Sequence, residues 1–332
     1  MTATRLSHLC LLLLTTATTT AQRVHERGAY LKQFALSSKA NSYENAYHHM
    51  LRLRDFQPPL LEIGNIAWVP NQAFKYYWAA RALAVERFIA GKPAPTTCEI
   101  GFGSGMSTSL LASATADPDD ATKGGRHFVF DCPQCGGGSN LTAAKAEGFA
   151  YLSKVFGPRL EQHLGPSVTE VPKFAAANPN VLCDVLSVDG DHSYAGVARD
   201  IHSLVFNASS MWNDQTIVFF DDVDKPGPKT AYYEAIQREW LVEIEKFAGF
   251  IQLDMMFSSQ VAKTSMSHHE VPDVTKVPKT LAYQKSFREA RFTQKAVTDA
   301  RSSEKIKTAY LVEMERRIGV EASKKRAGRR LA

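Results

Sequence analysis

Two kinds of hydrophobic pattern alternate through the middle of the chain. Short apolar runs typical of buried strands are followed by longer stretches in which apolar residues recur with helical spacing. The predicted strands end at residues 100, 131, 164, 188 and 220, and the intervening helices are 107–114, 142–156, 194–206 and 230–247, with a closing strand pair at 250–257 and 259–264. This alternation predicts a doubly wound, Rossmann-like α/β fold with a mostly parallel, seven-stranded sheet.

Helical additions are expected on both sides of this domain, which we place at residues 93–265. Residues 22–92 form an N-terminal helical cap, with helical spacing at 43–56 and an amphipathic helix at 71–90. The second helix either packs on the sheet or forms a lid over its pocket. Residues 266–332 form a helical C-terminal extension with a basic tail, which packs on the domain or mediates homo-oligomers.

The first 21 residues have the order of a secretory signal. Arg5 precedes the apolar run Leu9–Leu14, and a Thr/Ala-rich stretch leads to Ala21. We expect entry into the secretory pathway or secretion, with organelle import as the alternative. The apolar run is too short to span a bilayer, and no later stretch is long and apolar enough.

The charge distribution argues against a nucleic-acid-binding body. The net charge is +5, and the C-terminal tail supplies five cations without an acid: Lys324, Lys325, Arg326, Arg329 and Arg330. The rest of the chain is therefore near neutral, whereas nucleic-acid-binding surfaces cluster basic residues on one face.

The cysteines do not form a complete zinc set. Cys10 would leave with the signal, and Cys132 and Cys135 form an isolated CxxC followed by glycines. A loop disulfide or two unpaired thiols is the favoured interpretation, over a redox pair or half a zinc site. Cys98 and Cys183 lie on or beside apolar strands, so we expect them to be small core residues.

A glycine-rich turn follows the first predicted strand. Gly101, Gly103 and Gly105 stand at alternate positions after Glu99, and a helix begins directly afterwards. Glycines let a ligand approach the backbone, and the helix end presents free N–H groups. Met106 stands where a dinucleotide fingerprint requires glycine, so a Rossmann oxidoreductase is disfavoured. The alternative is that the glycines form a tight strand–helix turn that binds no ligand.

Carboxylates gather where later strands end. Asp131 ends the second strand, where its two oxygens would suit the vicinal diol of a ribose. Asp189 and Asp191 follow a strongly apolar strand, and Asp221 and Asp222 follow the next one. If these strands are neighbours, about 4.8 Å apart, the acids converge and a hard cation such as Mg²⁺ would relieve their repulsion. The alternative is that some of them, Asp191 especially, cap helices.

These motifs, in this order, resemble the class I S-adenosylmethionine-dependent methyltransferases. The segments are Cys98-Glu-Ile-Gly-Phe, Phe130-Asp131, Gly165-Pro-Ser167, Asp189-Gly-Asp-His-Ser-Tyr194 and Phe219-Phe-Asp-Asp222. The likeness covers roughly residues 74–260. It is to the group that contains the catechol-type and macrocin-type O-methyltransferases, and within that group the sequence most resembles their relatives in methyltransferase family 24. The Cys132–Gly138 loop departs from the pattern, and the catechol-type lysine base has no clear match, although Lys225 is near.

The resemblance implies roles for individual residues. It implies that S-adenosylmethionine contacts the acid before the glycine loop, the three glycines, two serines and two acids at strand ends. These residues are Glu99, Gly101, Gly103, Gly105, Ser107, Ser167, Asp131 and Asp189. It implies magnesium ligands at Asp189, Asp221 and Asp222, and proton transfer by Asp191 or His192, with Lys225 as a further catalytic candidate.

The function expected from these residues is magnesium-assisted methyl transfer from S-adenosylmethionine to a hydroxyl of a small acceptor. Methylation of a nitrogen or of a protein side chain is not excluded by the sequence. The alternative from another class is a non-catalytic secreted protein that keeps the fold for binding or scaffolding, because S-adenosylmethionine is made in the cytosol.

Overall fold

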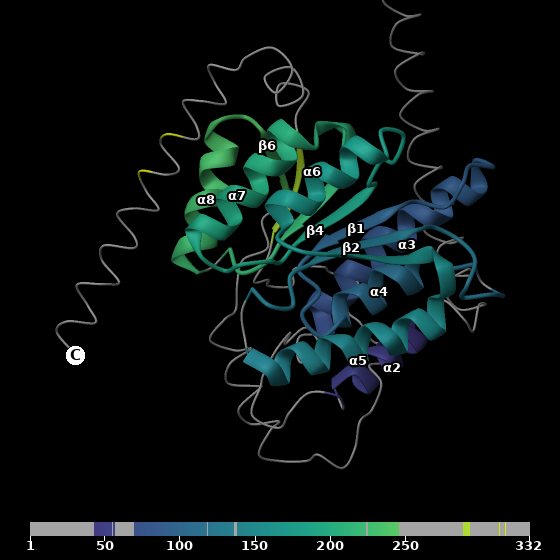
Figure 1. Ribbon diagram of the computed structural model, residues 1–332. Helices are drawn as coiled ribbons and strands as arrows, with labels where there is room; N and C mark the ends of the chain where they lie inside the picture. Colours follow the sequence, from purple (N-terminus) through teal and green to yellow (C-terminus); the bar gives the residue numbers. More distant parts are fainter. Residues whose placement is uncertain are drawn as a thin grey trace, which may run out of the picture.

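One sheet organises the described part of the chain (Figure 1). The computed structural model describes residues 43–54, 56, 70–117, 119–135, 138–223, 225–245, 288–292, 312 and 316. The strand order is β3-β2-β1-β4-β5-β7-β6. The strands are β1 (Thr97–Ile100), β2 (His127–Asp131), β3 (Leu160–Leu164), β4 (Val185–Val188), β5 (Ile217–Phe220), β6 (Leu241–Glu245) and β7 (Arg288–Phe292). The first five are parallel, which confirms the doubly wound α/β prediction.

The strand order reverses between β1 and β4. From β1 the chain proceeds to β2 and β3 on one side, and it then crosses over to β4 and β5 on the other side. In open α/β sheets, ligands bind outside the carboxyl ends of the strands at this switch point. The candidate residues of the sequence lie at this edge, because they follow the strands that meet there.

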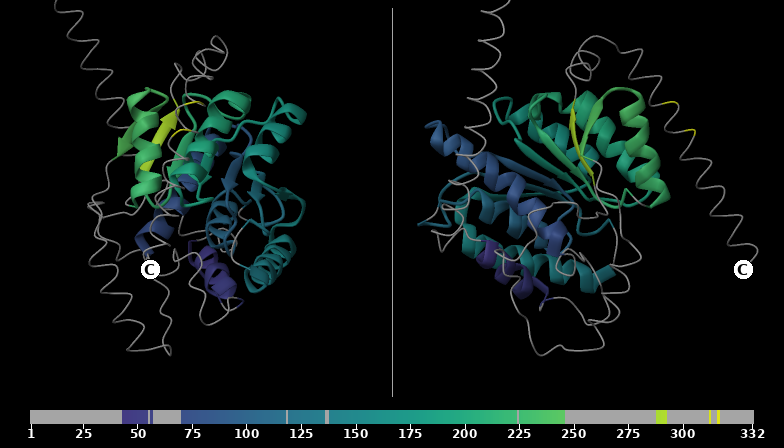
Figure 2. Two further views of the ribbon diagram at one scale, coloured as in Figure 1. Left: turned by 60° about the vertical axis from the view of Figure 1, so that its left-hand side comes forward. Right: turned by 180° about the vertical axis from the view of Figure 1, so that it is seen from behind.

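Two layers of helices cover the two faces of the sheet (Figures 1 and 2). Phe128 and Phe130 pack with one layer, and Val129 between them packs with the other, as the alternation of side chains along a strand requires. The first layer contains α6 (Ser167–Ala177), α7 (Tyr194–His202) and α8 (Pro226–Gln237). The second contains α2 (Tyr43–Arg54), α3 (Pro70–Ile89), α4 (Met106–Ala114) and α5 (Gly138–Phe156).

The predicted helix at 71–90 is α3, and its middle packs on the sheet. The ring of Tyr76 stacks on Phe219 of β5 with 4.6 Å between centroids. Its hydroxyl lies 2.9 Å from Oγ of Ser187 on β4. Tyr76 is buried, so this part of the N-terminal cap belongs to the core.

The end of the domain differs from the prediction. The expected helix at 230–247 begins earlier, at Pro226, and ends at Gln237, and its last residues form strand β6 instead. The predicted strands at 250–257 and 259–264 lie outside the described residues. The antiparallel partner of both β5 and β6 is β7, within the segment expected to be a helical extension. The sheet therefore extends beyond the predicted domain boundary at residue 265.

Two disulfides are present. Cys132 and Cys135 form a disulfide bond, which confirms the predicted loop disulfide. The alternative, that these two cysteines are unpaired thiols, is wrong. The expectation for Cys98 and Cys183 was incomplete, since these buried residues form a second disulfide with 5.7 Å between their Cα atoms. They are 85 residues apart in sequence, and only the pairing of β1 with β4 brings them together.

The predicted signal segment 1–21 lies outside the described residues. Within the described ranges, no helix combines the length and the apolar character needed to span a membrane.

Candidate functional site

The glycine loop turns the chain sharply between β1 and α4. Gly101, Gly103 and Gly105 all have positive φ, at 92°, 54° and 84°. A Cβ at Gly101 would lie 1.9 Å from the backbone oxygen of Asp189. Glycine is therefore required here for conformation and for space, and the loop lies directly against the end of β4.

Glu99 lies behind this loop and is fully buried. Its Oε1 accepts a hydrogen bond from Ser107 and its Oε2 accepts one from Thr108, both in the first turn of α4. Nε2 of His127 lies 3.5 Å from Oε2, and Nδ1 of the same ring is 2.6 Å from Oγ1 of Thr97. Glu99 and Ser107 were both predicted to contact the cofactor, and the structure places them in contact with each other.

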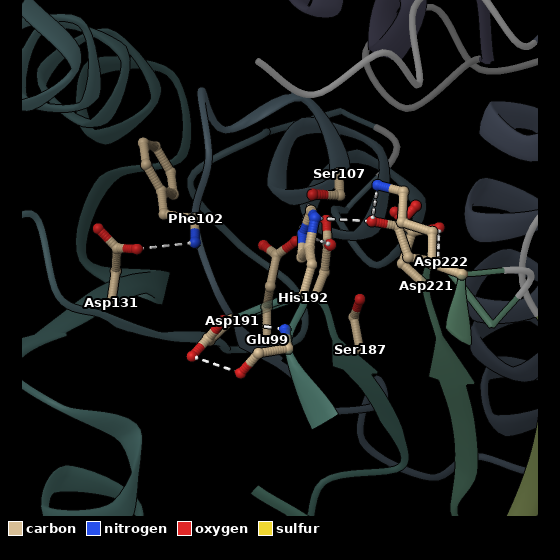
Figure 3. A network of polar contacts seen from close by, with 12 residues as sticks. Glu99, Phe102, Ser107, Asp131, Ser187, Asp191, His192, Asp221 and Asp222 are labelled. Atoms are coloured by element: carbon tan, nitrogen blue, oxygen red, sulfur yellow. Dashed lines mark hydrogen bonds and ion pairs between the residues drawn. The ribbon is translucent and has the colours of Figure 1, made fainter. Parts of the chain in front are cut away.

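Asp131 lies at the carboxyl end of β2 (Figure 3). Its Oδ1 accepts a hydrogen bond from the backbone N–H of Phe102 at 3.1 Å, which ties β2 to the glycine loop. Nζ of Lys145 on α5 lies 2.8 Å from Oδ1 and 3.1 Å from Oδ2. Asp131, the acid predicted to bind the ribose, thus forms an ion pair with Lys145.

His192 lies between Asp189, which follows β4, and Asp222, which follows β5 (Figure 3). Nε2 of His192 is 3.2 Å from Oδ1 of Asp189, and Nδ1 is 2.6 Å from Oδ2 of Asp222. Asp221 accepts the backbone N–H of Asp222 at 2.8 Å. Across the described ranges, no three His, Cys, Asp or Glu side chains lie close enough together to hold a metal ion.

Several solved structures are similar to this chain. The calicheamicin methyltransferase CalS11 is 14% identical, with a TM-score of 0.39 over 59% of this chain and 87% of that chain. The O-methyltransferase NovP is 16% identical, with a TM-score of 0.38 over 53% and 76%. MycE from the mycinamycin pathway, solved with Mg, SAH and mycinamycin VI, is 14% identical, with a TM-score of 0.35 over 61% and 52%. Among the curated proteins, none matches this sequence.

A family profile matches the sequence where the site lies. The profile describes the methyltransferase domain of family 24 and covers residues 98–223, from β1 to the acids after β5. Residues 98–223 are therefore similar to a methyltransferase domain. The family supports S-adenosylmethionine as the methyl donor, and the resemblance seen in the sequence is confirmed.

The carboxylates after β4 and β5 and the ring of His192 shift one another's pKa values. Hydrogen bonds to Asp189 and Asp222 raise the pKa of His192 to about 10, so this ring is protonated at neutral pH. Burial and the charges of Asp189 and Asp222 raise the pKa of Asp221 well above its ordinary value. The imidazolium of His192 thus lies between the carboxylates of Asp189 and Asp222. The carboxylate of Asp221 is buried, and burial disfavours its charged form.

The two other catalytic candidates, Asp191 and Lys225, each have a side-chain partner. Asp191 accepts hydrogen bonds from the backbone N–H and the hydroxyl of Ser193, both at 3.0 Å. Ser193 caps α7, so Asp191 supports the helix start and lies apart from the pair Asp221–Asp222 in Figure 3. Lys225 forms an ion pair with Asp222. Of the three candidates, His192 is the one that joins the two strand ends.

Ser167 lies at the start of α6, and its hydroxyl donates to Oδ1 of Asp200 on α7. Asp200 is 2% exposed, and its Oδ2 faces Gly190 in the loop after β4. Burial raises the pKa of Asp200 to about 7, although Ser167 opposes the shift. The predicted cofactor serine is therefore held by an acid that titrates near neutral pH.

The sequence did not predict the side chains that form hydrogen bonds and ion pairs with the predicted site residues. Thr108, His127, Lys145 and Asp200 all contact a predicted site residue, and none of them stands in a recognisable motif. Lys145 and Asp200 lie on helices, 14 and 33 residues from their partners. Helical periodicity identifies the buried face of such a helix, but it does not specify a polar partner on another element.

Proposed function

We propose that the chain is an S-adenosylmethionine-dependent O-methyltransferase that acts on a small hydroxylated acceptor with the assistance of magnesium. The observation that carries this proposal is the contact between the glycine loop and the acidic strand ends. Gly101 approaches the backbone of Asp189 so closely that no side chain fits between them. A donor held by the loop and an acceptor at the acids would meet across this contact, and such positioning supplies much of the rate of a group transfer.

The donor would lie along the loop, from the glycines to the ends of β2 and β3. Asp131 and Ser167 mark these ends, and we propose that they meet the ribose and the adenine. Glu99 has no exposed surface, so in this proposal it acts by fixing Ser107 and the first turn of α4. Gly105 at the N-cap of α4 provides no side-chain cap, and in this proposal the N–H groups at the helix start face the donor.

The residues fit magnesium by the chemistry of their donors. Asp189, Asp221 and Asp222 would hold it, since all three offer carboxylate oxygens, and burial together with the charges of Asp189 and Asp222 disfavours the ionised form of Asp221. When bound, magnesium would supply positive charge that lowers the pKa of a nearby acceptor hydroxyl. His192 provides positive charge between Asp189 and Asp222 in the present arrangement.

Proton transfer is assigned to His192 in this proposal. Its ring is half exposed and lies at the acidic edge, whereas Asp191 is bonded to Ser193. The ring holds its proton as long as both carboxylates accept from it, because their hydrogen bonds stabilise the imidazolium. When Asp189 and Asp222 no longer accept hydrogen bonds from the ring of His192, the ring can release its proton and act as a base.

Calorimetry of the full chain with S-adenosylmethionine tests the proposal first. We expect micromolar binding, and we expect Asp131→Asn to weaken it about tenfold through the lost charge-assisted hydrogen bond. Glu161→Gln, which neutralises an exposed acid on β3, is the matched control. A folded protein that does not bind would overturn the proposal and favour a non-catalytic binding or scaffold protein.

The role of magnesium is tested separately with Asp221→Asn. Once an acceptor has been found, we expect turnover of the wild type to require Mg²⁺ and that of the variant to fall at least a hundredfold. Donor binding should be retained, because Asp221 follows β5, whereas the proposed ribose and adenine contacts follow β2 and β3. Unchanged turnover and unchanged metal dependence would rule out the metal role.

We also infer that the protein folds in an oxidising compartment, as expected for a secreted chain. Its two disulfides support this inference, because such bonds are rare in the reducing cytosol. Alkylation of the protein from its own cells, followed by mass spectrometry, would contradict it if the four cysteines were free.

A further inference from the structure

The ion pair between Lys145 and Asp131 changes what this acid can bind. Both side chains are nearly buried, with 11% of Lys145 and 3% of Asp131 exposed. The ammonium reaches both carboxylate oxygens, at 2.8 and 3.1 Å. Charge-assisted contacts to both oxygens hold the carboxylate in one orientation.

A count of lone pairs shows how little of Asp131 remains available. An ionised carboxylate offers about four acceptor positions, two on each oxygen. Oδ1 accepts from the backbone N–H of Phe102 and from Lys145, so both of its positions are used. Within the part of the chain that the structure describes, Oδ2 accepts from Lys145 alone, which leaves one position. A ribose presents two neighbouring hydroxyls, and Asp131 in this arrangement can accept from one of them.

The ammonium has the complementary capacity. It carries three N–H donors, and among the described residues its two contacts are the two oxygens of Asp131. One donor therefore remains on a side chain that is adjacent to the acid and still slightly exposed. A hydroxyl that finds no acceptor on Asp131 can accept from this donor through its own oxygen.

We propose that the pair Asp131–Lys145, and not Asp131 alone, recognises the ribose diol of the cofactor. Oδ2 of Asp131 accepts a hydrogen bond from one hydroxyl, and Nζ of Lys145 donates one to the oxygen of the other. This inference rests on the proposed function, because it requires an adenosyl cofactor in the site. Lys145 is then a binding residue and also holds Asp131 in place.

Calorimetry with three ligands tests the inference on the full-length wild type. The ligands are S-adenosylhomocysteine and its 2′-deoxy and 3′-deoxy analogues, each of which lacks one hydroxyl. We expect each analogue to bind about tenfold more weakly, because each loses one hydrogen bond to a charged group. If either analogue binds as tightly as the parent, the pair does not read both hydroxyls and the inference is wrong.

Lys145→Met then assigns one hydroxyl to the lysine. This variant keeps an unbranched side chain, one atom shorter, and has no donor, so one of the two deoxy penalties should fall below about twofold while the other persists. Lys145→Arg keeps the charge and the donors, and it should retain both penalties. Lys154→Met, at an exposed lysine of the same helix, is the matched control.

The outcomes separate the two proposals. Persistence of both penalties in Lys145→Met would show that the ion pair is only structural. A folded wild type that binds none of the three ligands would instead overturn the proposed function. Because the comparison of analogues needs only the wild type, the inference stays testable if Lys145→Met does not fold.

Discussion

Single residues in this site are determined by their partners as much as by their own chemistry. Glu99, Asp131 and Asp200 are buried acids near one edge of the sheet, yet each is balanced differently. Glu99 accepts from two hydroxyls, Asp131 from an ammonium and a backbone N–H, and Asp200 from one serine. For Asp200, burial raises the pKa to about 7, and the single hydrogen bond from Ser167 opposes this shift only in part.

Asp200 should make the stability of the protein depend on pH. Burial raises its pKa from 3.8 to about 7 in the folded state, so the folded protein holds a proton there that the unfolded chain has released. The free energy of unfolding should therefore fall as the pH rises from about 4 to about 7, by a few kcal/mol. Asp200→Asn cannot titrate, and this part of the pH dependence should disappear.

Denaturant unfolding at about pH 5 and about pH 8 measures this effect. Relative to the wild type, Asp200→Asn should be more stable at the higher pH than at the lower one. Asp214→Asn, which neutralises an exposed acid before β5, serves as the control. Parallel pH profiles for wild type and Asp200→Asn would contradict the prediction.

At the scale of elements, the junction of α8 and β6 shows why one predicted helix was too long. The backbone N–H of Trp240 donates a hydrogen bond to the carbonyl of Ala235, and the preceding residue, Glu239, has a φ of 57°. This is the geometry of a Schellman motif, which usually has glycine at the left-handed position. The apolar spacing of residues 236, 240 and 244 fits a helix, but the backbone reverses at Glu239 and continues as a strand.

Glycine at position 239 should stabilise the protein. A side chain in the left-handed region costs about 1–2 kcal/mol, and glycine avoids this cost. We expect Glu239→Gly to be about 1 kcal/mol more stable than Glu239→Ala, since both variants remove the same carboxylate and only alanine keeps the strained Cβ. Thermal or denaturant unfolding of the two variants decides the question, and equal stabilities would exclude strain at this junction.

Helix α6 was not predicted at all. Pro172 lies inside it, and proline removes an N–H donor from a helix interior. The helix forms nonetheless, because Val171, Phe174 and Ala175 are buried in the core beneath it. Its first residue is Ser167, so an element missed in the sequence positions a residue that the resemblance had singled out.

At the scale of the whole molecule, the Cys98–Cys183 disulfide spans the switch point of the sheet. It joins β1, just before Glu99, to the segment that enters β4, and both cysteines are buried. It encloses a loop with a sequence separation of 85 residues, whereas the Cys132–Cys135 bond encloses one of 3. A longer closed loop restricts the unfolded chain more strongly.

The two disulfides should differ in their contribution to stability. The chain-entropy estimate is about 4–5 kcal/mol for the long loop and about 2 kcal/mol for the short one. Replacing Cys98 and Cys183 together by alanine should therefore lower the free energy of unfolding about twice as much as replacing Cys132 and Cys135. Non-reducing denaturant unfolding of the two double variants tests this, and equal losses would contradict the loop argument.

The sequence by itself determined the order and kind of most elements around the site. Strands β2 and β3 lie where the apolar runs predicted them, and α3 lies where the amphipathic pattern did. The glycine loop and the acids after β4 and β5 were recognisable because they adjoin strands in the chain. Such features depend on residues a few positions apart, whose geometry the backbone period dictates.

Only the tertiary structure decided which side chains meet. The Cys98–Cys183 bond, the Lys145–Asp131 pair and the position of His192 between Asp189 and Asp222 join residues on different elements. Strand order and helix placement set these contacts, and they arise from burying two apolar faces of one sheet at once. A linear pattern carries no distance between remote residues, so the partners that balance each buried charge appear only when the chain has folded.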